Sequence, residues 1–292
     1  MENEKHIANR EKNRVAYWSV VAAVFLTSFK FIVGVTTNSL GILSEAAHSG
    51  LDLVAALMTY FAVRFSAKPA DAEHNFGHGK IENFSALFET VLLLITCGWI
   101  IGEVIERIFG KGTEILVNKW SFIVISASII VDFSRSTALK KVAKKYNSQA
   151  LEADALHFSS DIYSSAVVFL GLIGVYFNFN YADSIAAFVV ALIVIFVSFN
   201  LGRRAIDVLL DKAPKGMKEK IEEIISDIPE VVYAHDIKIR SSGSQTLVEM
   251  NIHVDENMTI EKAHNISHEV ENILHQNFDD IDVHIHIEPG KN

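Results

Sequence analysis

Two nine-residue stretches, SEAAHSGLD at residues 44–52 and ADALHFSSD at residues 153–161, carry the same pattern of ionisable side chains. Each has a carboxylate, a histidine three residues later and an aspartate four residues after that. On an α-helix these positions share one face. Both stretches lie in long apolar segments, where an ionisable side chain costs roughly 2.5–3.5 kcal/mol. Groups this costly are retained where they face a partner or a polar cavity, so the stretches predict a functional site.

The apolar segments around these stretches are long enough to cross a membrane. A transmembrane helix needs roughly 20 mostly apolar residues, and the four prolines all fall outside the apolar blocks. The second and fifth segments are less apolar because they carry the ionisable groups. The sequence predicts six membrane-spanning helices, at roughly 15–36, 40–65, 83–107, 116–139, 150–177 and 182–204.

Lysines and arginines concentrate on one side of the predicted spans. The N-terminal segment and the loops between spans two and three and between spans four and five are basic. The turns between spans one and two and between spans five and six have neither residue type. Because basic loops stay in the cytoplasm, both termini are predicted to be cytoplasmic. The polar N-terminus lacks the apolar core of a signal peptide and is interpreted as a retained tail.

From about residue 207 the sequence changes to amphipathic and alternating patterns. Residues 215–227 and 259–276 predict helices, the second with Thr259 as its N-cap. Residues 231–240, 245–254 and 281–288 alternate like strands. The predicted fold is a six-helix transmembrane protein with a small α+β domain of order α-β-β-α-β. Its predicted parts are a tail (1–13), a transmembrane domain (14–206) and a cytoplasmic domain (207–292).

Two histidines and two aspartates of the paired stretches form a candidate ligand set. If the two helix faces meet, His48, Asp52, His157 and Asp161 offer two nitrogen and two oxygen ligands. That set suits four-coordinate Zn²⁺, and cobalt and cadmium fit the same geometry. One alternative is a pair of His–Asp contacts that only fixes helix packing, and another is a proton pathway without metal. The matching register on two separate helices favours metal binding.

Other ionisable groups in or near the spans are interpreted as structural. Glu45 and Asp154 lie one turn nearer the start of their helices and are interpreted as helix-start residues, with outer partners of the metal ligands as the alternative. Glu89, Glu103 and Asp132 lack a matching partner on another span. We therefore expect none of these five to bind metal directly.

Histidines also gather in the loop between spans two and three and in the C-terminal domain. Asp71, His74 and His78 lie in DAEHNFGHGK (71–80), and three such groups can bind a metal or simply make a polar loop. Seven of the twelve histidines lie in the final domain. They are interpreted as a regulatory metal site, with a set of surface histidines as the alternative. The helix sequence HNISHE (264–269) does not meet the HEXXH arrangement of metalloproteases.

With these residues in place, the chain resembles the cation diffusion facilitator family over nearly its whole length. The resemblance rests on LGILSEAAHSGLD (40–52), HNFGHGK (74–80), ALEADALHFSSD (150–161) and the histidine-bearing α-β-β-α-β tail. It implies a homodimer with six spans per protomer and a metallochaperone-like cytoplasmic domain. It also implies export of divalent metal in exchange for protons.

The family resemblance also implies which residues bind metal. It implies a transport site at His48, Asp52, His157 and Asp161, and a second site at Asp71, His74 and His78. It implies a cytoplasmic site at His235, His253, His264, His286 and Glu288. It further implies that Lys80 pairs with Asp211 at the dimer interface, with Asp207 as a nearby competitor.

The resemblance also implies which metal ion is transported and in which membrane the protein lies. Some family members have Asp where this chain has His48, and His resembles zinc-preferring members, although cadmium, cobalt, iron and manganese stay open. The short loop KKVAKKYNSQ (140–149) is typical of bacterial members, which implies the bacterial inner membrane. The predicted function is therefore proton-coupled efflux of a divalent metal, Zn²⁺ first, by alternating access.

Two other classes of protein are weighed against a transporter. One is a membrane-bound metal sensor that binds without net transport. The other is an intramembrane metalloenzyme, which the four predicted ligands disfavour because a catalytic zinc usually keeps one position open. The net charge of −9 and the absence of a basic surface exclude a nucleic-acid partner, so the predicted partners are metal ions, protons, the lipid bilayer and a second copy of the chain.

Overall fold

The computed structural model describes residues 2–37, 40–109, 119–176, 182–243, 245–278 and 280–290. The chain divides into two compact units. One unit joins Glu2–Lys68 to Ile81–Ile206, and the other joins Pro69–Lys80 to the residues from Asp207 onward. The loop 69–80 thus groups with the residues from Asp207 onward instead of with the helices on either side of it.

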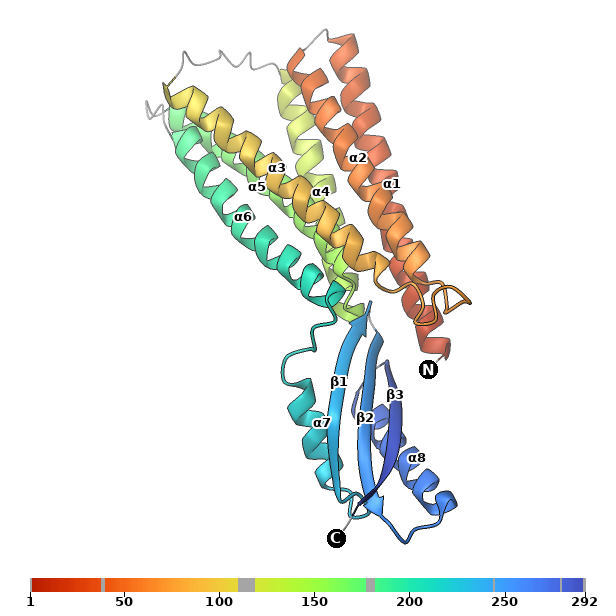
Figure 1. The fold of residues 1–292 in the computed structure, drawn as a ribbon. Helices are drawn as coiled ribbons and strands as arrows, with labels where there is room; N and C mark the ends of the chain where they lie inside the picture. The colour runs from red at the N-terminus through yellow and green to blue at the C-terminus, as the bar shows by residue number, and fades with distance from the viewer. Residues whose placement is uncertain are drawn as a thin grey trace. The chain divides into compact units, whose positions relative to one another are not determined.

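The first unit is a bundle of long helices (Figure 1). Within the described residues these are α1 (Glu2–Thr36), α2 (Leu40–Ser66), α3 (Ile81–Phe109), α4 (Lys119–Tyr146), α5 (Gln149–Tyr176) and α6 (Ala182–Leu209). Each predicted span falls on one of these helices. The main difference is α1, which begins well before the predicted span. Lys12, in the segment predicted as a tail, is buried, and its Nζ donates a hydrogen bond of 2.8 Å to Glu82 of α3.

Four helices are long and apolar enough to cross a membrane, as judged over the described residues. The qualifying segments are His6–Thr36, Ala46–Ser66, Ile81–Glu106 and Phe188–Leu209. Helix α2 qualifies although it carries His48 and Asp52, and most side chains of α5 from residue 164 onward lie outside the described part of the structure. Helix α4 is not among these segments, and its side chains at 119–122 lie outside the described part of the structure.

Small residues bring the helices together. The interface of α1, α2, α4 and α5 is built largely from buried alanines, with Leu139, Leu151 and Phe158 as its large side chains. Alanine lets helix backbones approach closely, which is how helices pack where the surrounding lipid is as apolar as the side chains. Large apolar side chains such as Trp99, Ile130 and Phe196 lie outward instead. This arrangement fits a bilayer as the solvent.

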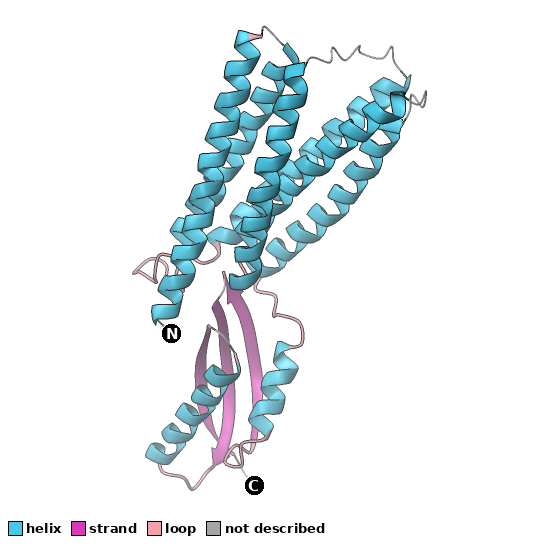
Figure 2. Ribbon diagram, turned by 180° about the vertical axis from the view of Figure 1, so that it is seen from behind, coloured by secondary structure: helices cyan, strands magenta, loops and turns pink. Residues whose placement is uncertain are grey.

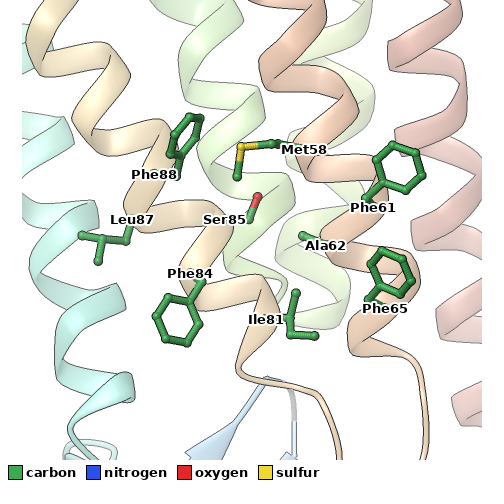
Figure 3. Close-up of a pocket in the computed structure, with 9 residues that line it drawn as sticks. All are labelled: Met58, Phe61, Ala62, Phe65, Ile81, Phe84, Ser85, Leu87 and Phe88. Carbon is green, nitrogen blue, oxygen red and sulfur yellow. The ribbon is translucent and has the colours of Figure 1, made fainter.

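Helices α2 and α3 enclose an apolar groove of about 550 Å³ (Figure 3). Its walls carry Phe61 and Phe65 from α2 and Phe84 and Phe88 from α3, and Ser85 is the one polar side chain among the nine lining residues. The lining offers no imidazole or carboxylate. The candidate sites built from imidazole and carboxylate ligands therefore lie elsewhere.

The second unit contains the predicted α-β-β-α-β domain (Figure 2). Its elements are α7 (Met217–Ser226), β1 (Tyr233–Ser242), β2 (Gln245–Asp255), α8 (Ile260–Asn277) and β3 (Ile281–Gly290). The strands lie in the order β1-β2-β3, with β1 antiparallel and β3 parallel to β2. The predicted N-cap is confirmed, because the Thr259 side chain accepts a hydrogen bond of 3.3 Å from the Lys262 backbone N–H.

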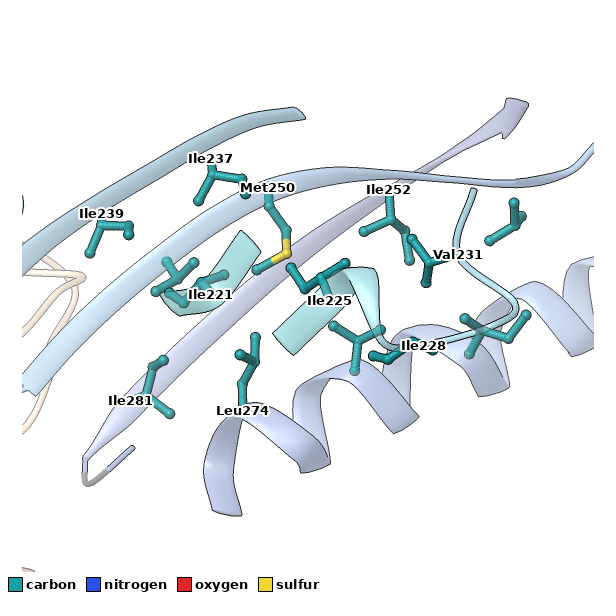
Figure 4. Packing of buried hydrophobic residues seen from close by; sticks show 14 residues of the cluster. Ile221, Ile225, Ile228, Val231, Ile237, Ile239, Met250, Ile252, Leu274 and Ile281 are labelled. Carbon is teal, nitrogen blue, oxygen red and sulfur yellow. The ribbon is translucent and has the colours of Figure 1, made fainter. Parts of the chain in front are cut away.

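One face of the sheet packs on the two helices to form the core of this domain (Figure 4). Strand β2 contributes Met250 and Ile252, and α8 contributes Val270 and Leu274, all at most 2% exposed. Because strand side chains alternate between faces, the residues between these core positions lie on the opposite face. Neither helix covers that face, and it is where His253 lies.

Candidate metal centres

Helices α2 and α5 bring the four predicted transport ligands, hereafter the tetrad, into one cluster. The His157 Nε2 atom lies 3.1 Å from Asp52 Oδ1 and 3.9 Å from Asp161 Oδ2. The His48 Nε2 atom lies 3.9 Å from an Oδ1 atom of each aspartate. Ligands on one tetrahedral zinc lie about 3.3 Å apart, because their bonds to the metal are about 2.0–2.1 Å long. One ligand atom each of His48, Asp52 and Asp161 lies within 4.8 Å of the others, and His157 contacts both aspartates.

The two histidines of the tetrad differ in their surroundings. The His157 side chain is 7% exposed, whereas that of His48 is 35% exposed. The Nδ1 atom of His157 has no hydrogen-bond partner among the described residues, so its ring is oriented by Asp52 and by packing. His48 is therefore the most accessible ligand of the four, and His157 is the buried one.

A chain of buried polar groups lies beside the tetrad, and the sequence did not predict it. The Ser19 hydroxyl donates to Asp154 Oδ2 at 3.1 Å and accepts from Arg135 Nη2 at 3.1 Å. Arg135 also pairs with Asp132 at 3.3 Å and stacks 3.5 Å from the centre of the Phe158 ring. Asp154 is fully buried. Its interpretation as a helix-start residue is therefore replaced by that of a link between α5, α1 and α4.

The remaining predicted structural carboxylates are placed only in part. Glu89 is fully buried and accepts a hydrogen bond from the Thr59 hydroxyl of α2. The side chains of Glu45 and Glu103 lie outside the described part of the structure. The contact of Glu89 agrees with a structural role between α2 and α3.

The loop 69–80 places its three predicted ligands together. The Asp71 carboxylate lies 3.2 Å from His74 Nδ1 and 3.5 Å from His78 Nε2. One ligand atom from each residue lies within 4.8 Å of the others. The backbone N–H of His74 donates to Asp71 at 2.7 Å and is the main cause that lowers the pKa of this carboxyl group. Asp71 is thereby held ionised, the form that binds a cation.

Lys80, at the end of this loop, pairs with the C-terminal domain. Its Nζ atom lies 2.6 Å from Asp211 Oδ1, and Arg240 Nη1 lies 3.9 Å from the other oxygen. The competitor Asp207 pairs with Lys212 instead, at 2.5 Å. The structure thus selects Asp211 as the partner, while its place at a dimer interface stays a prediction.

The uncovered face of the sheet gathers His235, His253 and Glu288, hereafter the sheet-face group. The His253 Nε2 atom lies 3.1 Å from Glu288 Oε2 and 3.0 Å from His235 Nε2. His235 Nε2 lies 3.6 Å from the same carboxylate oxygen. All three nitrogen and oxygen atoms fall within 4.8 Å of one another. One divalent ion can contact all three ligands after small side-chain movements.

A β-bulge puts His235 on this face. Between His235 and Lys238 the pairing with β2 gains one extra residue, and Asp236 has φ 53°. Without the extra residue, strict alternation would place His235 on the same face as Ile237, which lies in the core. The bulge reverses the alternation, so that His235 and Ile237 lie on opposite faces. The alternation of apolar and polar residues in the sequence does not show this change of face.

Two neighbours fix the orientation of the sheet-face ligands. The His253 Nδ1 atom lies 3.1 Å from the carbonyl oxygen of Pro289, which can only accept, so Nδ1 carries the proton and Nε2 is left with a lone pair. The Asn251 amide donates to Glu288 Oε1 at 2.9 Å. Outer partners of this kind orient metal ligands in proteins. Asn251 was not among the residues singled out by the sequence.

The other two predicted cytoplasmic ligands, His286 and His264, lie on different sides of the sheet. His286 Nε2 lies 3.7 Å from Glu288 Oε1, but its side chain is 67% exposed. His264 lies on α8, whose buried residues pack against the opposite face of the sheet. Within one protomer the structure therefore places His264 away from the sheet-face group, because the sheet itself separates them.

Comparison with protein families assigns both units. A model described as the cation efflux transmembrane domain matches residues 16–210. A second, described as the cytoplasmic domain of cation efflux proteins, matches residues 213–290. Together with the apolar helices, these matches make the chain a multi-pass membrane protein with a C-terminal cytoplasmic domain.

Two relatives that match nearly the whole chain agree with that assignment. An uncharacterized transporter of Methanocaldococcus jannaschii, MJ0449, is 33% identical over 95% of this chain and 99% of its own length. The cation-efflux pump FieF of Yersinia enterocolitica is 30% identical over 93% of this chain and 90% of its own. The solved metal-bound C-terminal domain of the CzcD transporter from Thermotoga maritima is 34% identical, with a TM-score of 0.25, over 26% of this chain and 90% of that domain.

These matches support a metal-ion substrate and a homodimeric assembly. They cover both units of the chain and nearly its whole length. They also favour a transporter over an enzyme, because the matched family moves its metal across a membrane. The chain belongs to the cation diffusion facilitator family and is a divalent-metal efflux transporter.

Proposed function

We propose that this transporter exports Zn²⁺ and similar transition-metal ions from the cytoplasm in exchange for protons. The observation that carries the proposal is the tetrad, in which α2 and α5 each contribute one imidazole and one carboxylate to a single cluster. Two nitrogen and two oxygen ligands suit Zn²⁺, whereas an all-oxygen set favours magnesium or manganese. Cadmium, cobalt and iron are the nearest competitors.

Proton exchange follows from the chemistry of the same ligands. Metal binds deprotonated carboxylates and neutral imidazoles, so protons compete with metal for the same atoms. A low pH on the far side of the membrane favours protonated ligands and releases the ion there. Rearrangement of α2 against α5 then exposes the tetrad to each side in turn, the alternating access of secondary transporters.

The remaining sites are assigned supporting roles in the same proposal. The loop group of Asp71, His74 and His78 binds a second ion on the cytoplasmic side. The sheet-face group, with His286 beside it, binds metal in the cytoplasmic domain and stabilises the homodimer. The Lys80–Asp211 pair lies near the dimer interface. Both termini are cytoplasmic, and the protein resides in a bacterial inner membrane.

Flux in proteoliposomes tests the role of the tetrad. Purified protein is reconstituted with a zinc-sensitive dye inside, an acidic lumen and external Zn²⁺, so that proton exit drives zinc entry. Asp161→Asn should abolish zinc accumulation, because it removes one of the two carboxylates that balance the charge of the ion. Asp282→Asn, at an exposed position of β3, is the matched control and should transport normally.

Three outcomes of this assay bear on the proposal. Accumulation that disappears when an ionophore collapses the pH gradient supports proton exchange. Unchanged flux in Asp161→Asn contradicts the tetrad assignment. Zinc binding without flux in the unsubstituted protein contradicts transport and favours a membrane-bound metal sensor.

A further inference from the structure

The buried ring of His157 is oriented largely by an aromatic neighbour. Its Nδ1 atom has no hydrogen-bond partner among the described residues, so the second hydrogen bond that usually orients a metal-binding imidazole does not hold it. The Phe158 ring instead meets it edge to face, with the ring centres 5.4 Å apart and the planes at 88°. Phe158 is itself fully buried in the interface of α1, α2, α4 and α5. The position of the Phe158 ring therefore constrains the direction in which His157 presents Nε2.

Arg135 of α4 holds the Phe158 ring in place. The central carbon of its guanidinium group lies 3.5 Å from the centre of that ring. A planar guanidinium stacks on an aromatic face, and the attraction is stronger where water is excluded. Both side chains are buried, so this stack is desolvated. Arg135 and His157 thus contact the same aromatic ring.

Polar groups from three helices fix Arg135. Its Nη1 atom lies 3.3 Å from Asp132 Oδ1 on the same helix, and its Nη2 atom donates to the Ser19 hydroxyl of α1 at 3.1 Å. Ser19 in turn donates to Asp154 of α5 at 3.1 Å. The guanidinium is therefore held at two of its nitrogens while its flat face lies on Phe158.

We propose that Arg135 is a positioning residue of the transport site, which sets the orientation of the His157 ring through Phe158 and thereby the affinity for the transported ion. The inference rests on the proposed function, because it takes His157 as a ligand of that ion. Partners that orient a metal ligand contribute about 10–100-fold to metal affinity in proteins. In this site, stacking takes the place of the second hydrogen bond to the imidazole.

A purely structural role for Arg135 predicts a different result. In that role the ion pair only joins α4 to α1 and α5. Charged groups within a membrane are costly, and the alanines of this interface join the helices without that cost. Loss of a structural ion pair lowers the amount of folded protein but leaves the zinc affinity of the folded fraction unchanged. Zinc affinity is therefore the measurement that separates the two roles.

Zinc uptake into proteoliposomes at graded Zn²⁺ concentrations measures this affinity as KM. Phe158→Leu should raise KM about 10–100-fold with little change in the maximal rate, because the His157 ring loses its fixed orientation. Arg135→Lys should raise KM similarly, because lysine keeps its charge near Asp132 but has no planar group to stack. Leu151→Ala, at a fully buried position of the same interface, is the matched control. It should lower the thermal stability but keep KM.

A double variant tests whether Arg135 acts through Phe158. Arg135→Lys combined with Phe158→Leu should then raise KM no more than either substitution alone, because residues that act through one contact are not additive. Effects that multiply would show that Arg135 acts on the ion by another route, and would overturn the inference. Ser19→Ala removes one hydrogen bond to Arg135 and should give a smaller rise in KM. It provides a milder second test if Arg135→Lys does not fold, and an unchanged KM in both Ser19→Ala and Phe158→Leu would contradict the positioning role.

Equilibrium binding keeps this inference distinguishable from the proposed function. Zinc held by the tetrad is measured in detergent micelles as the difference between the full chain and Asp161→Asn. If this zinc is bound and transported, but Phe158→Leu and Arg135→Lys bind it with unchanged affinity, the positioning role is wrong and the proposed function stands. If it is bound without flux, its affinity in the same variants still decides the positioning role. Absence of this zinc from the unsubstituted chain would overturn both.

Discussion

The tetrad and the sheet-face group use the same ligand types but hold them differently. In the sheet-face group, Pro289 fixes the His253 ring and Asn251 fixes the Glu288 carboxylate. Tyr233 stacks on His253 with the ring centres 4.1 Å apart. In the tetrad, the buried Nδ1 atom of His157 has no hydrogen-bond partner among the described residues. The His157 ring thus has one polar contact through Nε2, whereas the His253 ring is fixed through both of its nitrogens.

This difference fits the separate tasks proposed for the two sites. A transport site must bind and then release its ion, so its ligands must change position during the cycle. The tetrad draws its ligands from two separate helices, α2 and α5. A site that stabilises a domain gains from outer partners that keep its ligands in place. The sheet-face group draws its ligands from three hydrogen-bonded strands, which move together.

Removal of one carboxylate from each site should separate transport from binding. Asp52→Asn should lower zinc flux by more than ~100-fold, beyond the roughly 10–100-fold cost of losing an outer partner. Glu288→Gln should lose zinc from the cytoplasmic domain but keep measurable flux. Proteoliposome flux and bound-zinc counts on the same samples measure both effects. Equal loss of flux in the two variants would contradict the division of tasks.

The support around the sheet-face ligands should be measurable by itself. Asn251→Ala removes the donor to Glu288 and should weaken zinc binding at this site about 10–100-fold, with flux little changed. Asn265→Ala, at an exposed position of α8, is the matched control. Calorimetric titration of the full chain gives the affinities. If Asn251→Ala binds zinc as tightly as its control, the hydrogen bond from Asn251 to Glu288 does not contribute to metal affinity.

Much of the fold could be predicted from the sequence because its signals are local. Apolar length indicated the helices, alternation indicated the strands, and Thr259 marked the start of α8. The matched spacing of His48/Asp52 and His157/Asp161 predicted the tetrad from helix periodicity alone. Such patterns are properties of single elements, which a sequence displays directly.

The parts that could not be predicted depend on contacts between elements. The bulge after His235 moves that residue to the uncovered face, and alternation alone does not show it. Asp154 resembles a helix-start residue in the sequence, whereas its contact with Ser19 of α1 depends on how the helices pack. His264 lies on α8, and the sequence alone does not show which face of the sheet α8 covers.

The protonation of Asp71 in the loop group can be tested by changing the pH. The pKa of Asp71 is lowered below its ordinary value of 3.8, chiefly by the His74 backbone N–H. At pH values above this ordinary pKa, the hydrogen bonds to the ionised carboxylate stabilise the loop. This stabilisation is lost as the pH falls through the lower pKa of the folded state. Between pH 7 and pH 5, Asp71 should remain ionised. Metal binding in that range should then release no proton from it.

Carbon-13 NMR of selectively labelled aspartate measures this carboxyl group directly. The midpoint for Asp71 should lie below that of aspartate in an unstructured peptide. Asp71→Asn identifies its signal in the full chain. A midpoint above the peptide value would show that the loop does not hold the carboxylate as described.

The smallest expected effect concerns the Lys80–Asp211 pair. Both side chains are about a third or more exposed, at 33% and 45%, so water and salt screen their attraction. Lys80→Met should therefore lower the free energy of unfolding by less than about 1 kcal/mol, and less still at high salt. Thermal unfolding of the full chain at two salt concentrations measures this, with Lys218→Met of the exposed Lys218–Glu222 pair as control. A loss well above that of the control would mean that Lys80 is buried in the assembled dimer, where an ion pair is screened less.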